Sequence, residues 1–160
     1  MAYIKSNVSQ RKTDAGSFVA VLKYKHLFKP IEMWSNQYYY LNICKDNLLS
    51  EETSTIELLD FISEIPELEI IKEFEFKNKS PFPFTKILLL RAKSLNSWSE
   101  KDSDINKTNL ISIVCSKEDA DFIELKRVFV KIAKHLEWSL IDEETGCGIE
   151  NYIIWSPELE

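Results

Sequence analysis

Two amphipathic helical patterns, set among short strand-like runs, constrain the fold of this chain more than any other feature. The clearer one follows Ser116, where apolar residues recur at spacings of three and four over about four turns: Phe122, Leu125, Phe129, Ile132 and Leu136. The other begins at Ser54, with Glu57 at the spacing of a capping box, and ends before Pro66. Its predicted apolar stripe contains Ile56, Leu59 and Ile62. We expect these helices to supply one side of a core and strands the other.

The remaining apolar runs are short, and several alternate as half-buried strands do. Residues 68–76 place Leu68, Ile70, Phe74 and Phe76 on one face and acidic residues on the other. Further strands are expected at residues 17–24, 37–44, 85–92, 110–115, 138–141 and 152–155. This order predicts an α+β fold, with a mostly antiparallel sheet of roughly six to seven strands and both helices on one face. It resembles a ferredoxin-like split βαβ plan with additions.

The length of 160 residues is typical of one domain. Residues 1–16 are polar and lack periodicity, which predicts a flexible N-terminal arm before a single α+β domain over residues 17–160. Residues 93–109 are polar and charged apart from a few side chains such as Trp98. A connection of that length is uncommon inside a domain, so it is expected to be a mobile excursion or a binding loop.

The compartment is predicted from what the sequence lacks and from its cysteines. No apolar run approaches the roughly 20 residues that a bilayer requires, and the first residues do not resemble a signal peptide. The three cysteines are an odd number, and Cys44 and Cys115 lie in apolar strand-like runs. That usage is typical of buried, reduced thiols, so we expect a cytoplasmic protein with no membrane contact.

Catalytic and metal-binding motifs are absent from the sequence. The chain has three glycines, no Gly-rich phosphate loop, no His-Glu-x-x-His and no Cys-x-x-Cys. His26 and His135 lie far apart, and the helix dipole suffices to explain His135 in the last turn of its helix. We therefore predict no enzyme, no cofactor and no metal. One alternative stays open, a cysteine-dependent enzyme in which His26 or His135 serves Cys147.

Cys147 lies between Gly146 and Gly148 in an expected turn, where backbone amides could lower the pKa of its thiol. The neighbouring acids Asp142, Glu143 and Glu144 would raise that pKa instead. A tight hairpin turn whose middle residue is incidental explains the same sequence.

Charge is distributed unevenly along the chain, whose net charge of −6 argues against a nucleic-acid partner. Residues 51–75 contain nine acids and one base, Lys72, whereas residues 1–31 are basic. Glu57, Asp60 and Glu64 share one helical face, and Glu69, Glu73 and Glu75 share the solvent face of the next strand. These six carboxylates form either a solvated surface that aids solubility or a docking surface for a basic protein, with Tyr39 or Trp98 as aromatic anchors.

Residues 116–146 are expected to form a helix and then a short strand that ends in Asp142-x-x-Thr145-Gly146. This segment resembles the carboxy-terminal part of the immunity proteins of contact-dependent and polymorphic toxin systems. The resemblance implies a non-enzymatic cytosolic inhibitor that contacts a toxin domain through the acidic segment.

The leading hypothesis is therefore an immunity protein that neutralises a basic toxin by occluding its active site. Three alternatives remain: the cysteine-dependent enzyme, an accessory or structural subunit of a phage or secretion system, and a nucleic-acid binder that uses the basic N-terminal arm.

Overall fold

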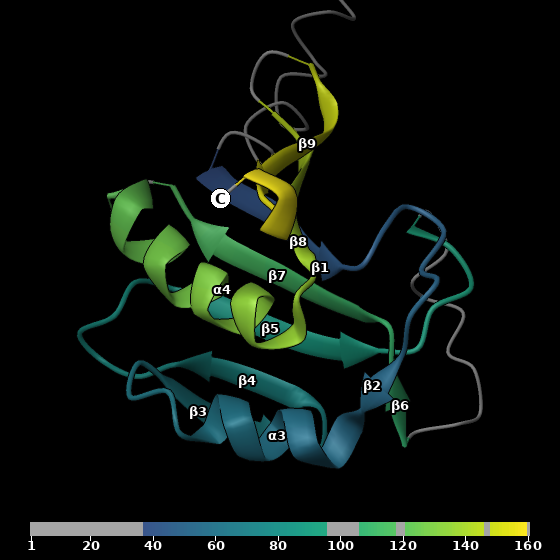
Figure 1. Cartoon of the computed structure of the whole chain (residues 1–160). Coiled ribbons are helices and arrows are strands. Elements are labelled where there is room, and N and C mark those ends of the chain that lie inside the picture. The colour runs from purple at the N-terminus through teal and green to yellow at the C-terminus, as the bar shows by residue number, and fades with distance from the viewer. Residues whose placement is uncertain (1–36, 96–105, 118–120, 146–147, 160) are drawn as a thin grey trace, which may run out of the picture. The chain divides into compact units, whose positions relative to one another are not determined.

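The computed structural model describes residues 37–95, 106–117, 121–145 and 148–159 (Figure 1). The chain divides into two units, residues 1–36 and residues 37–160, and the described residues all belong to the second unit. The predicted arm at residues 1–16, the predicted strand at residues 17–24 and the domain boundary between them lie outside the described residues.

A seven-stranded antiparallel sheet forms the centre of the second unit (Figure 1). Its strand order is β3-β4-β5-β7-β1-β8-β9, so β1 lies between two strands that come much later in the sequence. The strands are β1 (Tyr38–Cys44), β3 (Leu68–Lys72), β4 (Glu75–Asn78), β5 (Thr85–Leu90), β7 (Leu110–Ser116), β8 (Ser139–Glu144) and β9 (Glu150–Trp155). A separate two-stranded sheet pairs β2 (Thr53–Ser54) with β6 (Lys107–Thr108). The predicted α+β class and antiparallel sheet are confirmed.

The described residues contain two α-helices, α3 (Thr55–Ser63) and α4 (Phe122–Leu136), and a 3₁₀ turn, η2 (Pro157–Leu159). Helix α3 begins as predicted, because the Ser54 hydroxyl accepts a hydrogen bond from the Glu57 amide at 3.4 Å. Helix α4 is capped instead by Asp121, whose carboxylate accepts from the Ile123 amide at 3.1 Å. The predicted cap, Ser116, is buried at the end of β7.

Both helices and the sheet contribute to one hydrophobic core. Helix α4 buries the apolar stripe expected of it, with Phe129 and Ile132 fully inaccessible. Helix α3 buries Leu58 and Ile62 in the same cluster as Leu41 and Ile43 of β1 and Ile111 and Ile113 of β7. Each such aliphatic or aromatic side chain contributes about 1.5–3 kcal/mol when fully buried, so this cluster is the main source of stability.

The strand predicted over residues 68–76 is a hairpin. Strands β3 and β4 are joined by Glu73 and Phe74, and Ile70 pairs with Phe76 across the hairpin. The register of the hairpin shifts between Ile70 and Lys72, and this irregularity keeps Ile70 and Phe76 on the same face as a straight strand would, so the periodicity could not reveal the turn.

The predicted loop at residues 93–109 is described only at its ends. The Asn109 side chain joins these ends, because it accepts from the Ala92 amide at 2.8 Å and donates to the Ala92 carbonyl at 2.9 Å. Lys107 and Thr108 pair with residues 53–54 rather than forming irregular chain. Trp98 lies outside the described residues.

Candidate partner-binding surface

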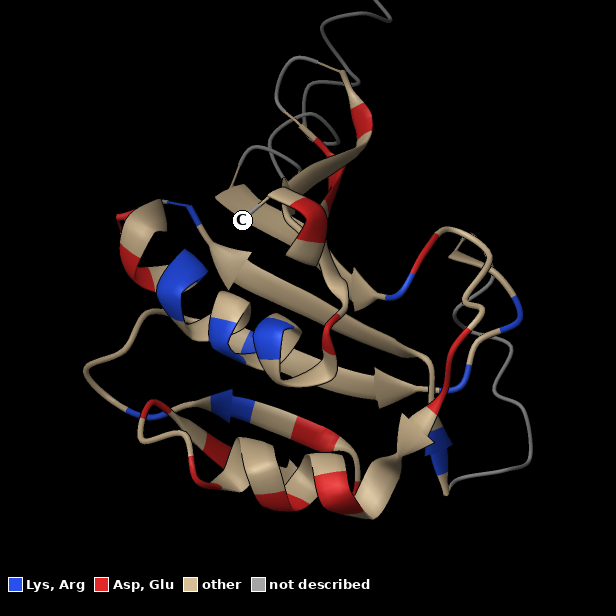
Figure 2. Cartoon of the chain, viewed as in Figure 1, with Lys and Arg blue, Asp and Glu red and all other residues tan. Residues whose placement is uncertain are grey.

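The outer side of α3 carries three of the predicted carboxylates. Glu57, Asp60 and Glu64 are exposed and recur at the helical spacing that puts them on one side (Figure 2). Within the described part of the chain, none of the three forms an ion pair. Beside them Ile56 is 62% exposed, although the sequence pattern placed it with Leu59 and Ile62 on the apolar stripe. These four residues, Ile56, Glu57, Asp60 and Glu64, are called the α3 face below.

The acids of the β3–β4 hairpin are placed differently. The Glu69 carboxylate lies 3.0 Å from the Lys77 ammonium, and the Glu75 carboxylate lies 3.4 Å from the Lys86 ammonium. Glu73 is exposed in the turn between the strands. Exposed pairs of this kind contribute at most about 1 kcal/mol, but they neutralise the charge. The unneutralised negative charge among the six predicted residues therefore belongs to Glu73 and the α3 face.

Tyr39, predicted as an aromatic anchor, packs inward. Its ring lies 4.7 Å from the Phe122 ring, and the Lys117 ammonium lies 4.9 Å from the Tyr39 ring centroid. Burial raises the pKa of the Tyr39 hydroxyl, with smaller contributions from Cys115 and Asp142. The neighbouring Tyr40 is 39% exposed and is the more accessible ring. Alternation along a strand puts Tyr39 and Tyr40 on opposite faces, but it does not say which of the two faces meets the core.

Helix α4 presents a basic surface that the sequence reasoning missed. Arg127, Lys131 and Lys134 are exposed at spacings of four and three, on the side away from the buried stripe (Figure 2). The Arg127 guanidinium donates a hydrogen bond to the Glu67 carboxylate at 2.8 Å. The signal was present in the sequence as basic residues at helical spacing.

Of the three residues in the alternative enzyme hypothesis, the structure describes only His135. Cys147 and His26 lie outside the described residues. His135 lies in the last turn of α4, as predicted, and its exposed ring contacts α3. Cys44 and Cys115 are buried, and burial raises the pKa of each thiol to about 12. A thiol in that state is protonated at neutral pH and is a poor nucleophile.

Among the described residues, no group of three or more His, Cys, Asp or Glu side chains could hold a metal ion. No helix in the described ranges has both the length and the apolar character needed to cross a membrane. Comparison with known proteins found no matching family model and no match among the curated proteins or the solved structures.

Proposed function

We propose that this chain is a non-enzymatic, cytoplasmic protein-binding domain that neutralises a basic partner. In its most concrete form it is an immunity protein that occludes the active site of a basic toxin domain. The observation that carries the proposal is the α3 face, where three exposed carboxylates without ion pairs among the described residues lie beside the exposed Ile56.

Charge and apolar area act at different stages of such binding. Unneutralised carboxylates attract a cationic surface over distances up to about a Debye length, so they raise the association rate. Ile56 acts only at contact, where burial of its side chain against the partner slows dissociation. Repulsion from Lys131 on α4, which forms no ion pair among the described residues, disfavours the docking orientations that would bring the partner over that helix.

The proposal includes a ferredoxin-like plan for the fold. The strand order β5-β7-β1-β8 supports it, because β1 separates β7 from β8 while α4 joins those two strands in sequence. The β3–β4 hairpin and β9 are then the additions. Leu41 and Ile43, two residues apart on β1, share a core cluster with both helices, which supports a position for α3 and α4 on one face of the sheet.

The experiment begins with capture of partners from lysate of the source cells on the immobilised chain, at low and high salt, and mass spectrometry of the bound proteins. Association of the purified partner is then measured by stopped flow as a function of salt. The triple variant Glu57→Lys, Asp60→Lys, Glu64→Lys should slow association by about 10-fold or more at low salt and flatten its salt dependence.

A control of opposite sign is available on the second helix. The variant Lys131→Glu, at a residue that forms no ion pair among the described residues, should leave association of a basic partner as fast or make it faster. If the α3 reversal leaves the association rate unchanged, the α3 face is not the binding surface. The immunity assignment has its own test, because the captured partner should inhibit growth when expressed alone and be harmless when expressed with this chain.

A further inference from the structure

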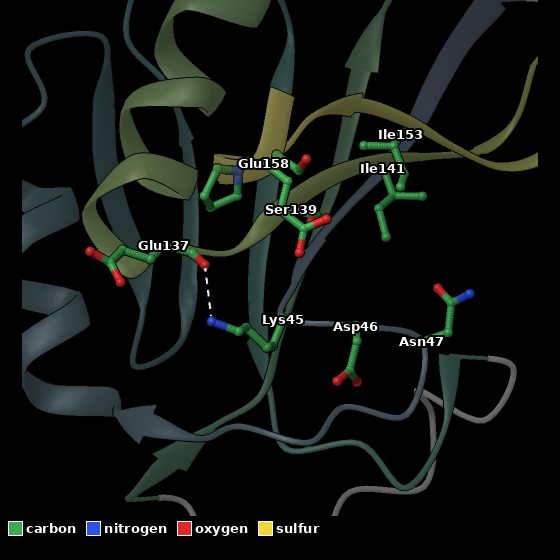
Figure 3. A pocket seen from close by; sticks show the side chains of 10 residues that line it. Lys45, Asp46, Asn47, Glu137, Ser139, Ile141, Ile153 and Glu158 are labelled. Atoms are coloured by element: carbon green, nitrogen blue, oxygen red, sulfur yellow. Dashed lines mark hydrogen bonds between the residues drawn. The ribbon is translucent and has the colours of Figure 1, made fainter. Parts of the chain in front are cut away.

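A pocket of about 330 Å³ lies where the end of β1, the start of β8 and the residues after β9 meet (Figure 3). This volume is at the lower end of the range of ligand pockets, about 300–1,000 Å³. The pocket shares no lining residue with the α3 face. It is therefore a separate feature of the molecule.

One wall of the pocket is apolar. Ile141 of β8 and Ile153 of β9 are cross-strand partners, and both line the pocket together with Pro157 (Figure 3). Ile141 is buried, whereas Ile153 is 47% exposed. The paired side chains present aliphatic surface against which a ligand with a hydrocarbon stem can pack.

Polar side chains also line the pocket. Ser156 is only 7% exposed, and its hydroxyl makes no hydrogen bond to the part of the chain that the structure describes. Ser139 and Asn47 line the same pocket and likewise make no side-chain hydrogen bond within the described ranges. No buried side-chain oxygen or nitrogen among the described residues lacks a partner, so the Ser156 hydroxyl oxygen keeps access to solvent and is an acceptor that a ligand donor can reach.

The charge at the pocket is negative. The Asp46 carboxylate is held in place by the amides of Leu48 and Ser50, at 2.9 and 3.1 Å, and by the Ser50 hydroxyl. Glu158 lines the pocket and is exposed, without an ion pair in the described part of the chain.

The lysine at the pocket is already engaged. The Lys45 ammonium lies 3.3 Å from the Glu51 carboxylate and donates to the Glu137 carbonyl at 3.5 Å, while the Glu137 carboxylate points away (Figure 3). The Lys45 charge is therefore offset by Glu51, and Asp46 and Glu158 determine the sign of the charge that a ligand meets.

We propose that this pocket binds an arginine side chain of a protein partner. The hydrocarbon stem packs on Ile141 and Ile153, and the guanidinium donates hydrogen bonds to the Glu158 carboxylate and to the Ser156 hydroxyl, while Asp46 adds negative charge nearby. The proposed function supplies the basic partner from which the arginine comes, but the pocket itself does not depend on the α3 face.

Arginine fits the acceptors better than lysine. The acceptors come from separate segments, with Ser139 in β8, and Ser156 and Glu158 after β9. A planar guanidinium has five N–H donors in a fixed fork and can bond several separated acceptors at once. An ammonium is a compact charge with three donors, and its strong hydration must be removed at greater cost.

The test uses the full ¹⁵N-labelled chain and N-acetyl-arginine methylamide as the probe. Saturable amide shifts are expected at Asn47, Ser139 and Ser156, with a dissociation constant in the millimolar range typical of a single side chain. Glu158→Lys should weaken binding about 10-fold, because it removes a charge-assisted acceptor and adds repulsion. Ser156→Ala should weaken it several-fold, and Glu57→Lys on α3 is the matched control that should leave it unchanged.

Three outcomes would overturn the proposal: no saturable shift with the wild-type chain, equal loss in Glu57→Lys and Glu158→Lys, or no loss in either pocket variant. Equal binding of N-acetyl-lysine methylamide would overturn the assignment to arginine. A pocket that fails these tests leaves the proposed function standing if the α3 reversal still slows partner association. If the probe binds but the α3 reversal leaves partner association unchanged, the pocket proposal stands and the α3 face is rejected as the docking surface.

Discussion

His135 of α4 stacks on Phe61 of α3, with ring centroids 3.6 Å apart and ring planes inclined by 3°. The stack joins the helix that carries unpaired exposed acids to the helix that carries exposed bases. Close to it in sequence, Arg127 of α4 bonds Glu67, which follows α3, at 2.8 Å. The two oppositely charged helices are thus held side by side by an aromatic contact and a charged one.

The aromatic contact should be measurable by a double-mutant cycle. Phe61→Leu and His135→Ala are each expected to lower the free energy of unfolding, and the coupling between them should be about 0.5–1.5 kcal/mol. Urea unfolding of the wild type, both single variants and the double variant gives this number. Strictly additive single effects would mean that the stack contributes nothing beyond the packing of each ring.

Helix α3 offers a matched pair that tests which of its sides is buried. Ile62→Ala should lower the free energy of unfolding by about 2–5 kcal/mol, because it opens a cavity in the core. Ile56→Ala should change it by less than about 0.5 kcal/mol, since that side chain is exposed. The same Ile56 variant should raise the dissociation rate of the partner. Similar losses of stability in both variants would contradict the orientation of the helix.

The sequence specified the fold class well because periodicity reports burial within one element. The α4 stripe and the strand at residues 110–115 were both located to within a few residues. The same reasoning misplaced Ile56, because α3 spans only nine residues and adjacent apolar positions allow more than one stripe. It also missed the β3–β4 turn, since the register shift between Ile70 and Lys72 preserves alternation across the hairpin.

The candidate site was less predictable because it depends on contacts between elements. Glu69 and Glu75 looked equivalent to Glu57 and Asp60 in the sequence, but cross-strand pairing puts Lys77 and Lys86 beside them. The lining of the proposed arginine pocket comes from residues 45–47, from residues 137–141 and from the chain after residue 152. No local pattern connects those segments, so only the sheet order brings them together.

The unpaired acids of α3 should cost stability when no partner is bound. Asp60 has Glu57 three residues before it and Glu64 four residues after it, so it makes two like-charge contacts. Asp60→Lys should raise the free energy of unfolding by about 0.5–1 kcal/mol at low salt, and Asp60→Asn by about half as much. Unfolding at low and high salt checks this, because the gain should shrink as salt increases. A loss of stability in both variants would show that Asp60 has a favourable interaction.

Two aspartates should affect the pH dependence of stability with opposite signs. Burial raises the pKa of Asp142, so its ionised form destabilises the fold at neutral pH, and this penalty disappears as pH falls below the pKa of an unfolded aspartate. Asp142→Asn should therefore be more stable than the wild type at pH 7 and equal to it in acid.

Hydrogen bonds from Ser50, followed by those from Leu48 and Leu49, lower the pKa of Asp46. Asp46 therefore contributes stability above the ordinary pKa of aspartate and loses it as pH falls through its lowered value. Asp46→Asn should be less stable than the wild type at pH 7, with the difference vanishing in acid. Urea midpoints measured between about pH 3 and pH 8, a range that includes the ordinary pKa of aspartate, check both signs. A common sign for the two variants would contradict the assigned causes.

The buried thiols make the enzyme alternative testable. Because burial raises the pKa of Cys44 and Cys115 to about 12, neither should react with a disulfide reagent at pH 8 in the folded chain. A Cys147→Ser variant should therefore show no reactive thiol when native and two in urea. Rapid native labelling of that variant would contradict the burial of Cys44 or Cys115. With those two silent, labelling of the wild type reports Cys147 alone, and a rate no faster than that of a free model thiol would remove the cysteine-dependent enzyme from consideration.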